Sequence, residues 1–517
     1  MKKAAKGIIG LSAALAVLGG GLAALKLTEP KEENNQEESS SQVSENPDAG
    51  DEVVLIKDKN ITGTDPDTGL DLEGVIEKVD VKNKTDELHV IKKTDKTEDS
   101  AATYTLDGYD DINLNTSVVG TLANNANGML SASTIDENPE NLGKYGLENP
   151  EITVDITYET GSQTTLMIGN ETPKGGEKYV MTSEGNTVYT VKSSTLANYS
   201  KTLFDFIQST IVETPDQSNY PIVESLKVER EDIDYDILLE YDEKSNDDGY
   251  NGGTSATHLM VQPVEAYISV ERSTDITNGI FGLSSKGVYS VHSTEADIAE
   301  AGLKEPFCTV TMDCDKDEYD YTLYLSEPFA DEDNGKCCYA MLKGGNVIYI
   351  VSAENAKWLT VQPIDIASRI FIASYVWNIT DLKVECEGEN YDFVIKPKDP
   401  DNKPETLSSD DFVTTLNNAE FDTERYRQFY SFLISASAEN FALDVEIPDS
   451  EPLASLEYTD SYTNETVKID FYDYSNLTAQ AVINGKSKFF VAKSYVTTLI
   501  GNAKKLNTDD EFITTWK

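Results

Sequence analysis

The chain has 517 residues, of which 39% are hydrophobic, and carries a formal net charge of −50 at pH 7. This length is enough for about three domains of ordinary size. The negative charge is spread along the chain and would repel a polyanion, so the composition argues against a nucleic-acid-binding function.

Residues 7–25 form an uncharged apolar run that follows three lysines, Lys2, Lys3 and Lys6. The run is about long enough to span a bilayer as a helix, and the lysines predict a cytoplasmic N-terminus. It is either an uncleaved signal anchor or a signal peptide cleaved near Leu22-Ala23-Ala24. We favour the anchor because no clean small-x-small cleavage site precedes a polar start. Residues 1–28 are therefore expected to be a cytoplasmic stub and a single transmembrane anchor in the cell membrane, with the bulk of the chain extracytoplasmic.

Residues 29–56 follow as a polar, acidic stretch without aromatic side chains. Such a segment cannot bury enough apolar surface to fold by itself. We expect a disordered acidic tether between the membrane and the folded part of the chain.

A short pattern of apolar residues then occurs three times, which predicts a tandem array. In each copy, two apolar positions on one strand and two on the next are separated by a polar turn, so each copy predicts a β-hairpin. The internal spacing is the same in the three copies: Val79, Val81, Leu88 and Val90; Leu226, Val228, Tyr235 and Ile237; and Leu382, Val384, Tyr391 and Phe393.

A second pattern follows each hairpin and predicts an antiparallel meander. After Pro150, apolar residues alternate with polar ones from Ile152 to Tyr158, which is typical of a strand with one buried face. Return strands are expected around Leu166, Tyr179 and Val188. The corresponding residues of the later copies are Cys308, Val310, Met312, Cys314, Leu323, Leu325, Ile348, Tyr349 and Val351, and then Leu456, Tyr458, Phe489 and Val491.

Helices are predicted between these strands. Asn115 is a candidate N-cap for a helix with one apolar face. The expected members of that face are Val118, Val119, Leu122, Ala126 and Met129. Leu196, Tyr199 and Leu203 have helical spacing, and so does an aromatic stripe of Tyr426, Phe429, Tyr430 and Leu433, which is typical of a buried face.

The expected fold class is α+β, a tandem repeat of about three modules, each a hairpin plus helix plus meander, behind an N-terminal transmembrane helix. The predicted boundaries are residues 57–213, 214–374 and a divergent third module at 375–517. The second module carries an insert rich in Asp, Asn and Gly at residues 242–257, which predicts a surface loop.

Metal-binding patterns are weak. The acidic segment at residues 65–73 is similar to a calcium loop, but it lacks the glycine at the sixth position, and Ile76 stands where a bidentate carboxylate is needed. Cys308 and Cys314 lie on the predicted buried face and are expected to be core residues. A disulfide from Cys337 or Cys338 to Cys314 stays open as an alternative. We predict no metal and no cofactor.

Catalytic motifs are also missing from the sequence. It has no phosphate-binding glycine loop, no nucleophile elbow and no zinc-protease motif. The three histidines, His89, His258 and His292, have no catalytic partner fixed by spacing. We therefore expect no catalytic residues and no enzymatic activity.

The first meander resembles domain-of-unknown-function family 4340. The resemblance rests on Tyr145-Gly146-Leu147 with Pro150, on Leu166-Met167-Ile168-Gly169, on Tyr179-Val180 and on Val188-Tyr189 with Val191. The N-terminal apolar segment also fits this family. The resemblance implies no known activity. Similar proteins are often encoded beside ABC-transporter subunits and gliding-motility-type auxiliary membrane proteins, which implies a surface-exposed accessory role.

Two functions are consistent with these patterns. The first is a non-enzymatic, membrane-tethered extracytoplasmic protein that contacts ABC-transporter membrane subunits. The alternative is a bacterial cell-surface protein that binds an envelope polymer or glycan, with Tyr241, Tyr250 and Tyr321 as candidates to stack on sugar rings. The oligomeric state is left open by the sequence.

Overall fold

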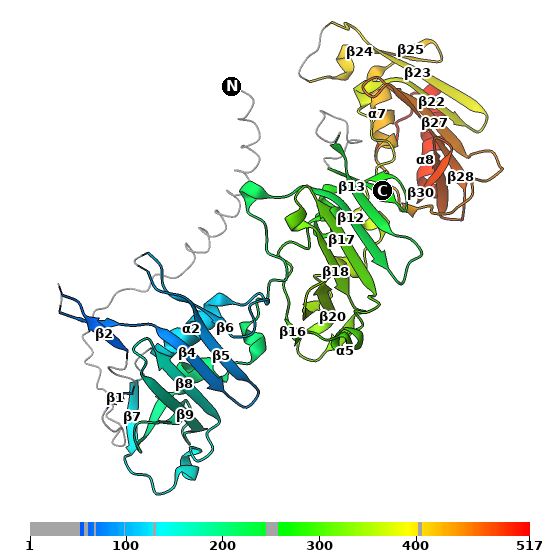
Figure 1. The fold of residues 1–517 in the computed structure, drawn as a ribbon. Coiled ribbons are helices and arrows are strands. Elements are labelled where there is room, and N and C mark those ends of the chain that lie inside the picture. Colours follow the sequence, from blue (N-terminus) through cyan, green and yellow to red (C-terminus); the bar gives the residue numbers. More distant parts are fainter. Residues whose placement is uncertain are drawn as a thin grey trace, which may run out of the picture.

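The computed structural model describes residues 52–55, 60–66, 69–97, 99–127, 131–243, 257–401 and 406–516. The predicted anchor at residues 7–25 and most of the insert at 242–257 lie outside them. Within these ranges, no helix is both long and apolar enough to cross a membrane. The fold mixes α and β structure, with few helices, and its strands pair antiparallel in three large sheets that follow one another along the chain (Figure 1).

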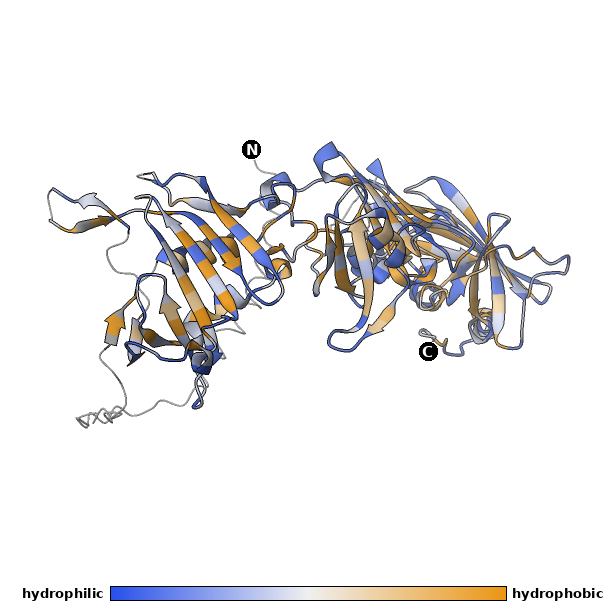
Figure 2. Cartoon of the chain, turned by 60° about the horizontal axis from the view of Figure 1, so that its bottom comes forward, coloured by the Kyte–Doolittle hydropathy of each residue, from blue (hydrophilic) through white to orange (hydrophobic). Residues whose placement is uncertain are grey.

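The first sheet has nine strands in the described residues, in the order β1-β7-β11-β10-β9-β8-β4-β5-β6. A separate hairpin of β2 (Ile61–Thr64) and β3 (Asp71–Glu73) projects from it (Figure 2). The strands of the sheet are β1 (Glu52–Val54), β4 (Ile76–Lys82), β5 (Glu87–Thr94), β6 (Thr103–Leu106), β7 (Ser131–Asp136), β8 (Ile152–Tyr158), β9 (Gln163–Glu171), β10 (Glu177–Thr182) and β11 (Val188–Lys192).

The second sheet has the order β15-β14-β13-β12-β17-β18-β20-β21-β16, with β19 added beside β20. Its strands are β12 (Val223–Arg230), β13 (Ile237–Tyr241), β14 (His258–Gln262), β15 (Ala266–Tyr267), β16 (Gly287–Val291), β17 (Cys308–Cys314), β18 (Tyr321–Leu325), β19 (Phe329–Asp331), β20 (Gly335–Leu342) and β21 (Val347–Ser352).

The third sheet has the order β25-β24-β23-β22-β27-β28-β29-β30-β26. Its strands are β22 (Ile379–Cys386), β23 (Glu389–Pro397), β24 (Phe412–Leu416), β25 (Ala419–Phe421), β26 (Asn440–Phe441), β27 (Ala454–Asp460), β28 (Glu465–Asp473), β29 (Thr478–Ile483) and β30 (Lys486–Ala492).

Hairpin and meander share one sheet in each region of the chain. The first strand of the hairpin pairs with the first strand of the meander, as β4 with β8, β12 with β17 and β22 with β27. The predicted apolar positions face each other across this pairing: Val81 lies opposite Val154, Val228 opposite Val310 and Val384 opposite Leu456. All six side chains are buried, because one face of every sheet is covered.

One detail of the predicted register is wrong. In the second hairpin, Val228 pairs with Ile237 and Leu226 pairs with Leu239, so Tyr235 lies in the turn. The corresponding pairs of the first hairpin are Val81 with Leu88 and Val79 with Val90. The second turn is therefore two residues longer. Arg230, the last residue of β12, has a buried side chain that forms an ion pair with Asp232 in this turn.

Short helices pack against the sheets, most of them on the face that holds the main core. They are α2 (Thr116–Asn127), α3 (Ser193–Leu196), α4 (Val270–Thr277), α5 (Glu295–Glu300), α6 (Pro363–Ile366), α7 (Thr423–Leu433) and α8 (Lys493–Lys504). The predicted cap is present, since the Asn115 side chain accepts a hydrogen bond from the Val118 amide over 3.3 Å. Val119, Leu122 and Ala126 are buried as expected, whereas Met129 lies outside the described residues.

The aromatic stripe of α7 is a core face, as predicted, and all four of its members are buried. The helical spacing near Leu196 and Tyr199 produces not one helix but α3 followed by two 3₁₀ turns, Ala197–Ser200 and Leu203–Phe206. The break falls at Lys201, whose backbone is extended.

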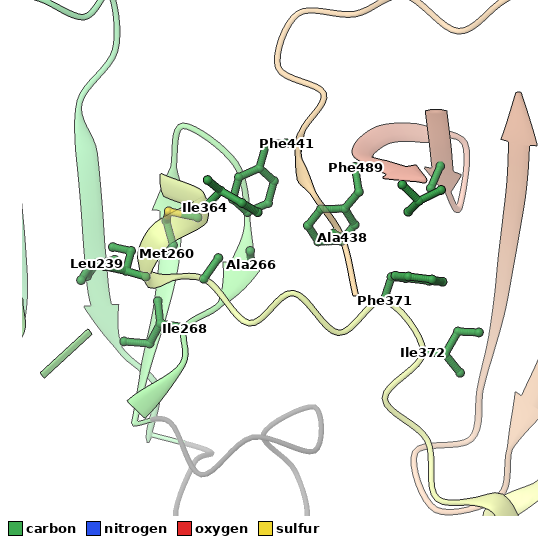
Figure 3. Packing of buried hydrophobic residues seen from close by; sticks show 14 of the residues in the cluster. Leu239, Met260, Ala266, Ile268, Ile364, Phe371, Ile372, Ala438, Phe441 and Phe489 are labelled. Atoms are coloured by element: carbon green, nitrogen blue, oxygen red, sulfur yellow. The ribbon is translucent and has the colours of Figure 1, made fainter. Parts of the chain in front are cut away.

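The second and third sheets share one continuous apolar core, whereas the first sheet has a core mainly of its own. Phe441 of β26 stacks on Phe489 of β30 with ring centroids 5.1 Å apart (Figure 3). Phe371 of the connecting segment contacts Phe471 and Tyr495 of the third region. These rings belong to the third region and to the segment that leads into it, and the two sheets are joined by the apolar core that they share.

The first and second sheets meet through backbone contacts. The amide of Ile211 donates to the carbonyl of Leu283, and the amide of Gly282 donates to the carbonyl of Val212, each over 2.8 Å. A further contact, between Asp111 and His292, spans 3.1 Å. This joint is more polar than the one between the second and third sheets.

Candidate functional site

A cleft of about 550 Å³ lies where the second region of the chain meets the third. One wall is the long turn between β12 and β13 together with the loop between β14 and β15. The opposite wall is the segment after β26 together with the start of β30. The lining residues are Asp234, Tyr235, Asp236, Gln262, Pro263, Val264, Ala442, Leu443, Asp444, Ser487 and Lys488.

The charges in this cleft have both signs. Asp234, Asp236 and Asp444 supply carboxylates, and Lys488 supplies an ammonium group. Burial lowers the pKa of Lys488, and the nearby Glu265 carboxylate opposes this effect. Asp236 also accepts a hydrogen bond from Lys227 over 2.9 Å. Lys488 is therefore a cation held partly out of water, where a ligand anion would be bound more strongly than at the surface.

The wall formed by the long turn is held from beneath by Arg230, whose side chain is 1% exposed. Its guanidinium donates to the carbonyl of Val361 over 2.6 Å and to both carboxylate oxygens of Asp232 over 2.8 and 3.1 Å. These contacts from Arg230 lower the pKa of the Asp232 carboxyl. Next to it, the Tyr235 hydroxyl donates to Gln362 over 3.3 Å, and burial raises its pKa. The wall is thus fixed by a two-pronged ion pair.

The opposite wall is organised by Gln480, which is fully buried. Its side-chain amide donates to the hydroxyl of Ser487 over 2.7 Å and to the carbonyl of Glu446 over 3.2 Å. Ser487 donates in turn to the carbonyl of Ala442 over 3.3 Å. The buried side-chain amide of Gln480 therefore connects the segment after β26 to the start of β30, the two parts of this wall.

The groups that line the cleft can hold a ligand by hydrogen bonds and by charge. Carboxylates accept hydrogen bonds from hydroxyl or ammonium groups, and the lysine donates to an anionic group. The lining contains Ser487, but its hydroxyl is engaged with Ala442 and Gln480, and no histidine lines the cleft. Such a lining can form hydrogen bonds with hydroxyl groups and can accommodate charges of either sign.

The histidines are placed by structural contacts. His258 is buried beside a second cavity of about 320 Å³, where its Nε2–H donates to the carbonyl of Val223 over 2.7 Å. Burial lowers the pKa of His258. His89 is half-exposed on β5, as expected for a solvent-facing position, and contacts Asp80 over 2.5 Å. His292 contacts Asp111 at the joint between sheets. The structure brings no two histidines together among the contacts of the described residues.

The cysteines are all buried free thiols, so the disulfide from Cys337 or Cys338 to Cys314 is not formed. Burial raises the pKa of Cys308 and of Cys314 to about 12, which keeps both thiols protonated and unreactive. Cys308 and Cys314 lie in the core, as predicted.

The acidic segment at residues 65–73 forms the turn of the β2–β3 hairpin, in which the Gly69 amide donates to the carbonyl of Asp65 over 2.8 Å. Residues 67 and 68 lie outside the described ranges. Across the part of the chain that is described, no group of three or more His, Cys, Asp or Glu side chains is placed to hold a metal ion.

Of the three predicted sugar-stacking tyrosines, the two that the structure describes are not exposed rings. Tyr321 is partly buried and packs edge-to-face on Phe281, with centroids 6.3 Å apart. Tyr241 is partly buried against His258 beside the second cavity. Tyr250 lies outside the described residues. Tyr235 in the cleft, which sequence reasoning assigned to a strand, is better placed to meet a ligand.

The sequence does not predict the cleft, because the residues of its two walls, such as Asp234 and Lys488, are more than two hundred positions apart in the chain. Neither stands in a motif. The only available signal was the arginine of Glu229-Arg230-Glu231-Asp232, a charged residue at the end of an apolar strand pattern. A cleft between two regions of a chain depends on their packing, which no local pattern encodes.

Comparison with known proteins gives a partial assignment. No curated protein and no solved structure matches the chain. The family model described as a domain of unknown function (DUF4340) matches residues 105–266, a range that begins in β6 and ends in β15. The resemblance inferred from Tyr145-Gly146-Leu147 and Gly169 is thereby confirmed: the segment at residues 105–266 matches the domain of unknown function DUF4340.

Proposed function

We propose that this protein is a non-enzymatic, membrane-tethered extracytoplasmic component that acts as an accessory or interaction subunit of an ABC-type transport complex. The observation that carries the proposal is the row of three sheets behind a lysine-flanked apolar segment at residues 7–25. A row of sheets offers a long surface to a membrane partner. The match to DUF4340 supports the proposal only through the gene neighbourhoods that the family resemblance implies.

The three sheets are proposed to be modules of one tandem array, at residues 57–213, 214–374 and 375–517. Eight strands have equivalent positions in the three sheets and follow one another in the same order. This order runs from β6 to β7 in the first sheet, from β14 to β16 in the second and from β24 to β26 in the third. A helix follows the edge strand each time, as α2, α4 or α7. Repetition of one unit explains this shared order economically.

Co-purification tests the transport proposal. The full-length protein would be isolated from its native membrane in mild detergent, beside a variant in which a cleavable signal replaces residues 7–25. The expected result is that ABC-transporter subunits accompany the full-length protein and are lost from the released variant. Recovery of the protein alone would contradict the proposal, and turnover by the extracytoplasmic part that a point mutation abolishes would contradict the non-enzymatic assignment.

A second candidate function is binding of an envelope polymer or glycan, and the cleft between the second and third sheets favours it. Asp234, Asp236 and Asp444 can accept hydrogen bonds from sugar hydroxyls, and Tyr235 lies between the first two. The test is retention of the protein on purified cell-wall material. Retention should fall for Asp234→Asn combined with Asp444→Asn and should persist for Asp401→Asn, a substitution outside the cleft. Absence of retention by the unaltered protein would remove this candidate.

A further inference from the structure

The edge strand β6 of the first sheet lacks a neighbour that the corresponding strands of the other sheets have. In the second sheet β14 pairs with β15, with Met260 opposite Ala266. In the third sheet β24 pairs with β25, with Leu416 opposite Ala419 and Thr414 opposite Phe421. In the first sheet β6 is the terminal strand, and β5 is its only strand neighbour among the described residues.

The three edge strands are equivalent by register. Leu106 of β6 lies opposite Val90, just as Met260 lies opposite Leu239 and Leu416 opposite Phe393. The next residue also makes the same contact in the first and third sheets: the amide of Asp107 donates to His89, and that of Asn417 donates to Asp392, each over 2.8 Å. Leu106 and Tyr104 therefore correspond to Leu416 and Thr414.

The outward backbone groups of β6 follow from this register. Successive residues of an antiparallel strand direct their N–H and C=O groups to opposite sides. Because Asp107 faces β5, Leu106 and Tyr104 face away from it. The carbonyl of Leu106 accepts a hydrogen bond from the Tyr109 amide over 3.2 Å. Among the described residues, the outward backbone groups of Tyr104 have no backbone hydrogen-bond partner, although the residue as a whole is only 6% exposed. They are therefore an unpaired strand edge.

The segment that would close this edge is directed elsewhere. In the other sheets, β15 and β25 come shortly before the caps of α4 and α7. The equivalent residues before Asn115 turn away, since the Ile112 amide donates to the carbonyl of Tyr109 over 3.1 Å. Asp111 of this segment is bound to His292 of the second sheet instead. Contact between the sheets therefore leaves β6 open.

A groove lies where the absent strand would lie. It has a volume of about 570 Å³ and runs between β6 and the start of α2. One side is formed by residues of β6, including Tyr104, and the other by Ile112, Ser117 and Gly120. The space is therefore bounded by the same two elements that enclose β25 in the third sheet, an edge strand and the helix after it.

We propose that this edge of the first sheet binds an extended segment of another polypeptide, which adds as a strand to β6. Strand addition supplies affinity through main-chain hydrogen bonds and specificity through alternate side chains. The residue opposite Tyr104 corresponds to Phe421, which packs on Phe393 at 5.5 Å in the third sheet, so an apolar side chain fits there.

The negative charge of the protein indicates which side chains the bound segment carries at its remaining positions. Asp110 lines the groove, Asp107 and Asp111 flank it, and Lys93 is the one cation among the lining residues. With a net charge of −50, the protein would attract a basic segment and repel an acidic one. The occupant is thus an extended segment that alternates apolar and basic residues. This inference depends on the proposed interaction role in one respect: the bound segment is assumed to come from a different protein.

The test uses the full-length protein in detergent and a synthetic octapeptide that alternates valine with lysine. Binding is measured by fluorescence anisotropy, and strand addition by slower hydrogen exchange of the Tyr104 and Leu106 amides. We expect the peptide to bind and to protect these amides, and a valine–glutamate octapeptide of equal length to bind at least tenfold more weakly.

A variant that fills the groove tests where the peptide binds, and a matched variant elsewhere is the control. A side chain at Gly120 of α2 would meet no atom within 4 Å of its Cβ, and the same holds for Gly501 of α8. Gly120→Trp should weaken peptide binding at least tenfold, while Gly501→Trp should leave it unchanged. Ser117→Trp is a second blocking variant if Gly120→Trp does not fold.

Three outcomes would overturn the inference: no protection of the two amides, equal binding of the acidic peptide, or binding that both blocking variants leave intact. Protection of the same amides by self-association of the protein, without peptide, would also overturn it, because the occupant would then be a second copy. Loss of transporter co-purification with peptide binding intact would refute the proposed function and leave the strand edge standing.

Discussion

The carboxylate of Asp111 accepts a hydrogen bond from the Nε2–H of His292 over 3.1 Å, although Asp111 lies between β6 and α2 and His292 follows β16 of the second sheet. The amide of Asn346 also donates to Asp111, and the His292 ring stacks on Tyr109 with centroids 5.0 Å apart. His292 holds a φ of 50°, which residues other than glycine rarely adopt. These contacts tie residues 109–111 to the second region of the chain.

Replacement of Asp111 should therefore loosen this joint. In Asp111→Ala, His292 and Asn346 lose their shared acceptor, while the backbone contacts of Ile211 and Gly282 remain. Small-angle X-ray scattering should show a broader distribution of interatomic distances. Asp110→Ala is the matched control, because Asp110 lines the groove and makes no such contact in the described structure. Equal distributions for the two variants would contradict the role given to Asp111.

The same joint should respond to acid. The hydrogen bond from His292 lowers the pKa of Asp111. A carboxyl whose pKa is lower in the folded state contributes stability above its unfolded pKa of about 4, and this is lost as the pH falls through the folded value. The scattering profile should therefore broaden at a pH below about 4 in the native chain, whereas Asp111→Ala should lack this step. A profile that does not change with pH would contradict the assignment.

The glycine at position 169 of the family motif is required for a steric reason. A Cβ on Gly169 of β9 would lie 2.2 Å from the carbonyl oxygen of Tyr145, so the strand and the turn before β8 could not approach. Gly169→Ala should lower the free energy of unfolding by about 2–3 kcal/mol. Gly185→Ala, where a Cβ meets no atom within 4 Å, should change it by less than about 0.5 kcal/mol. Urea unfolding of the two variants measures the difference, and equal stabilities would refute the steric explanation.

The strands were predictable because their signal is local. Val79, Val81, Val154 and Ile156 alternate with polar residues, and period-two alternation marks the covered face of a strand. The capping role of Asn115 and the aromatic face of α7 have equally local signals. These features do not depend on which strand lies beside which.

Pairing and packing required the structure. The long turn of the second hairpin was missed because Tyr235 also fits an apolar strand position, and only the pairing of Val228 with Ile237 excludes that register. The cleft that contains Lys488 depends on contacts between the second and third regions, such as the hydrogen bond from the Ala438 amide to the carbonyl of Arg369. The open edge of β6 became visible only by comparing three sheets strand by strand.

The buried arginine under the cleft should be important for stability. Arg230→Ala would leave the carbonyl of Val361 without its 2.6 Å partner and would separate Asp232 from its cation. We expect a loss of about 2–3 kcal/mol in the free energy of unfolding, below the range for a fully buried pair because Asp232 is half-exposed. Arg272→Ala, at an exposed position of α4, is the control and should be nearly neutral. Chemical denaturation measures both, and a neutral Arg230→Ala would contradict the structural role.

Lys488 should have the opposite effect, because a lysine held partly out of water costs stability while it is charged. Burial lowers its pKa in the folded state, so the unfolded chain binds more protons and stability rises with pH up to the unfolded pKa of about 10.4. Lys488→Met removes this cost and should increase the free energy of unfolding at pH 7, with a smaller gain at pH 10. Lys486→Met, at an exposed position of the same strand, is the control and should change the free energy of unfolding at pH 7 by less than about 0.5 kcal/mol. A destabilised Lys488→Met variant at pH 7 would mean that the contact of the ammonium group with the Phe489 ring, 5.7 Å from its centroid, outweighs the cost of burial, and the cleft would then have no free cation to offer a ligand.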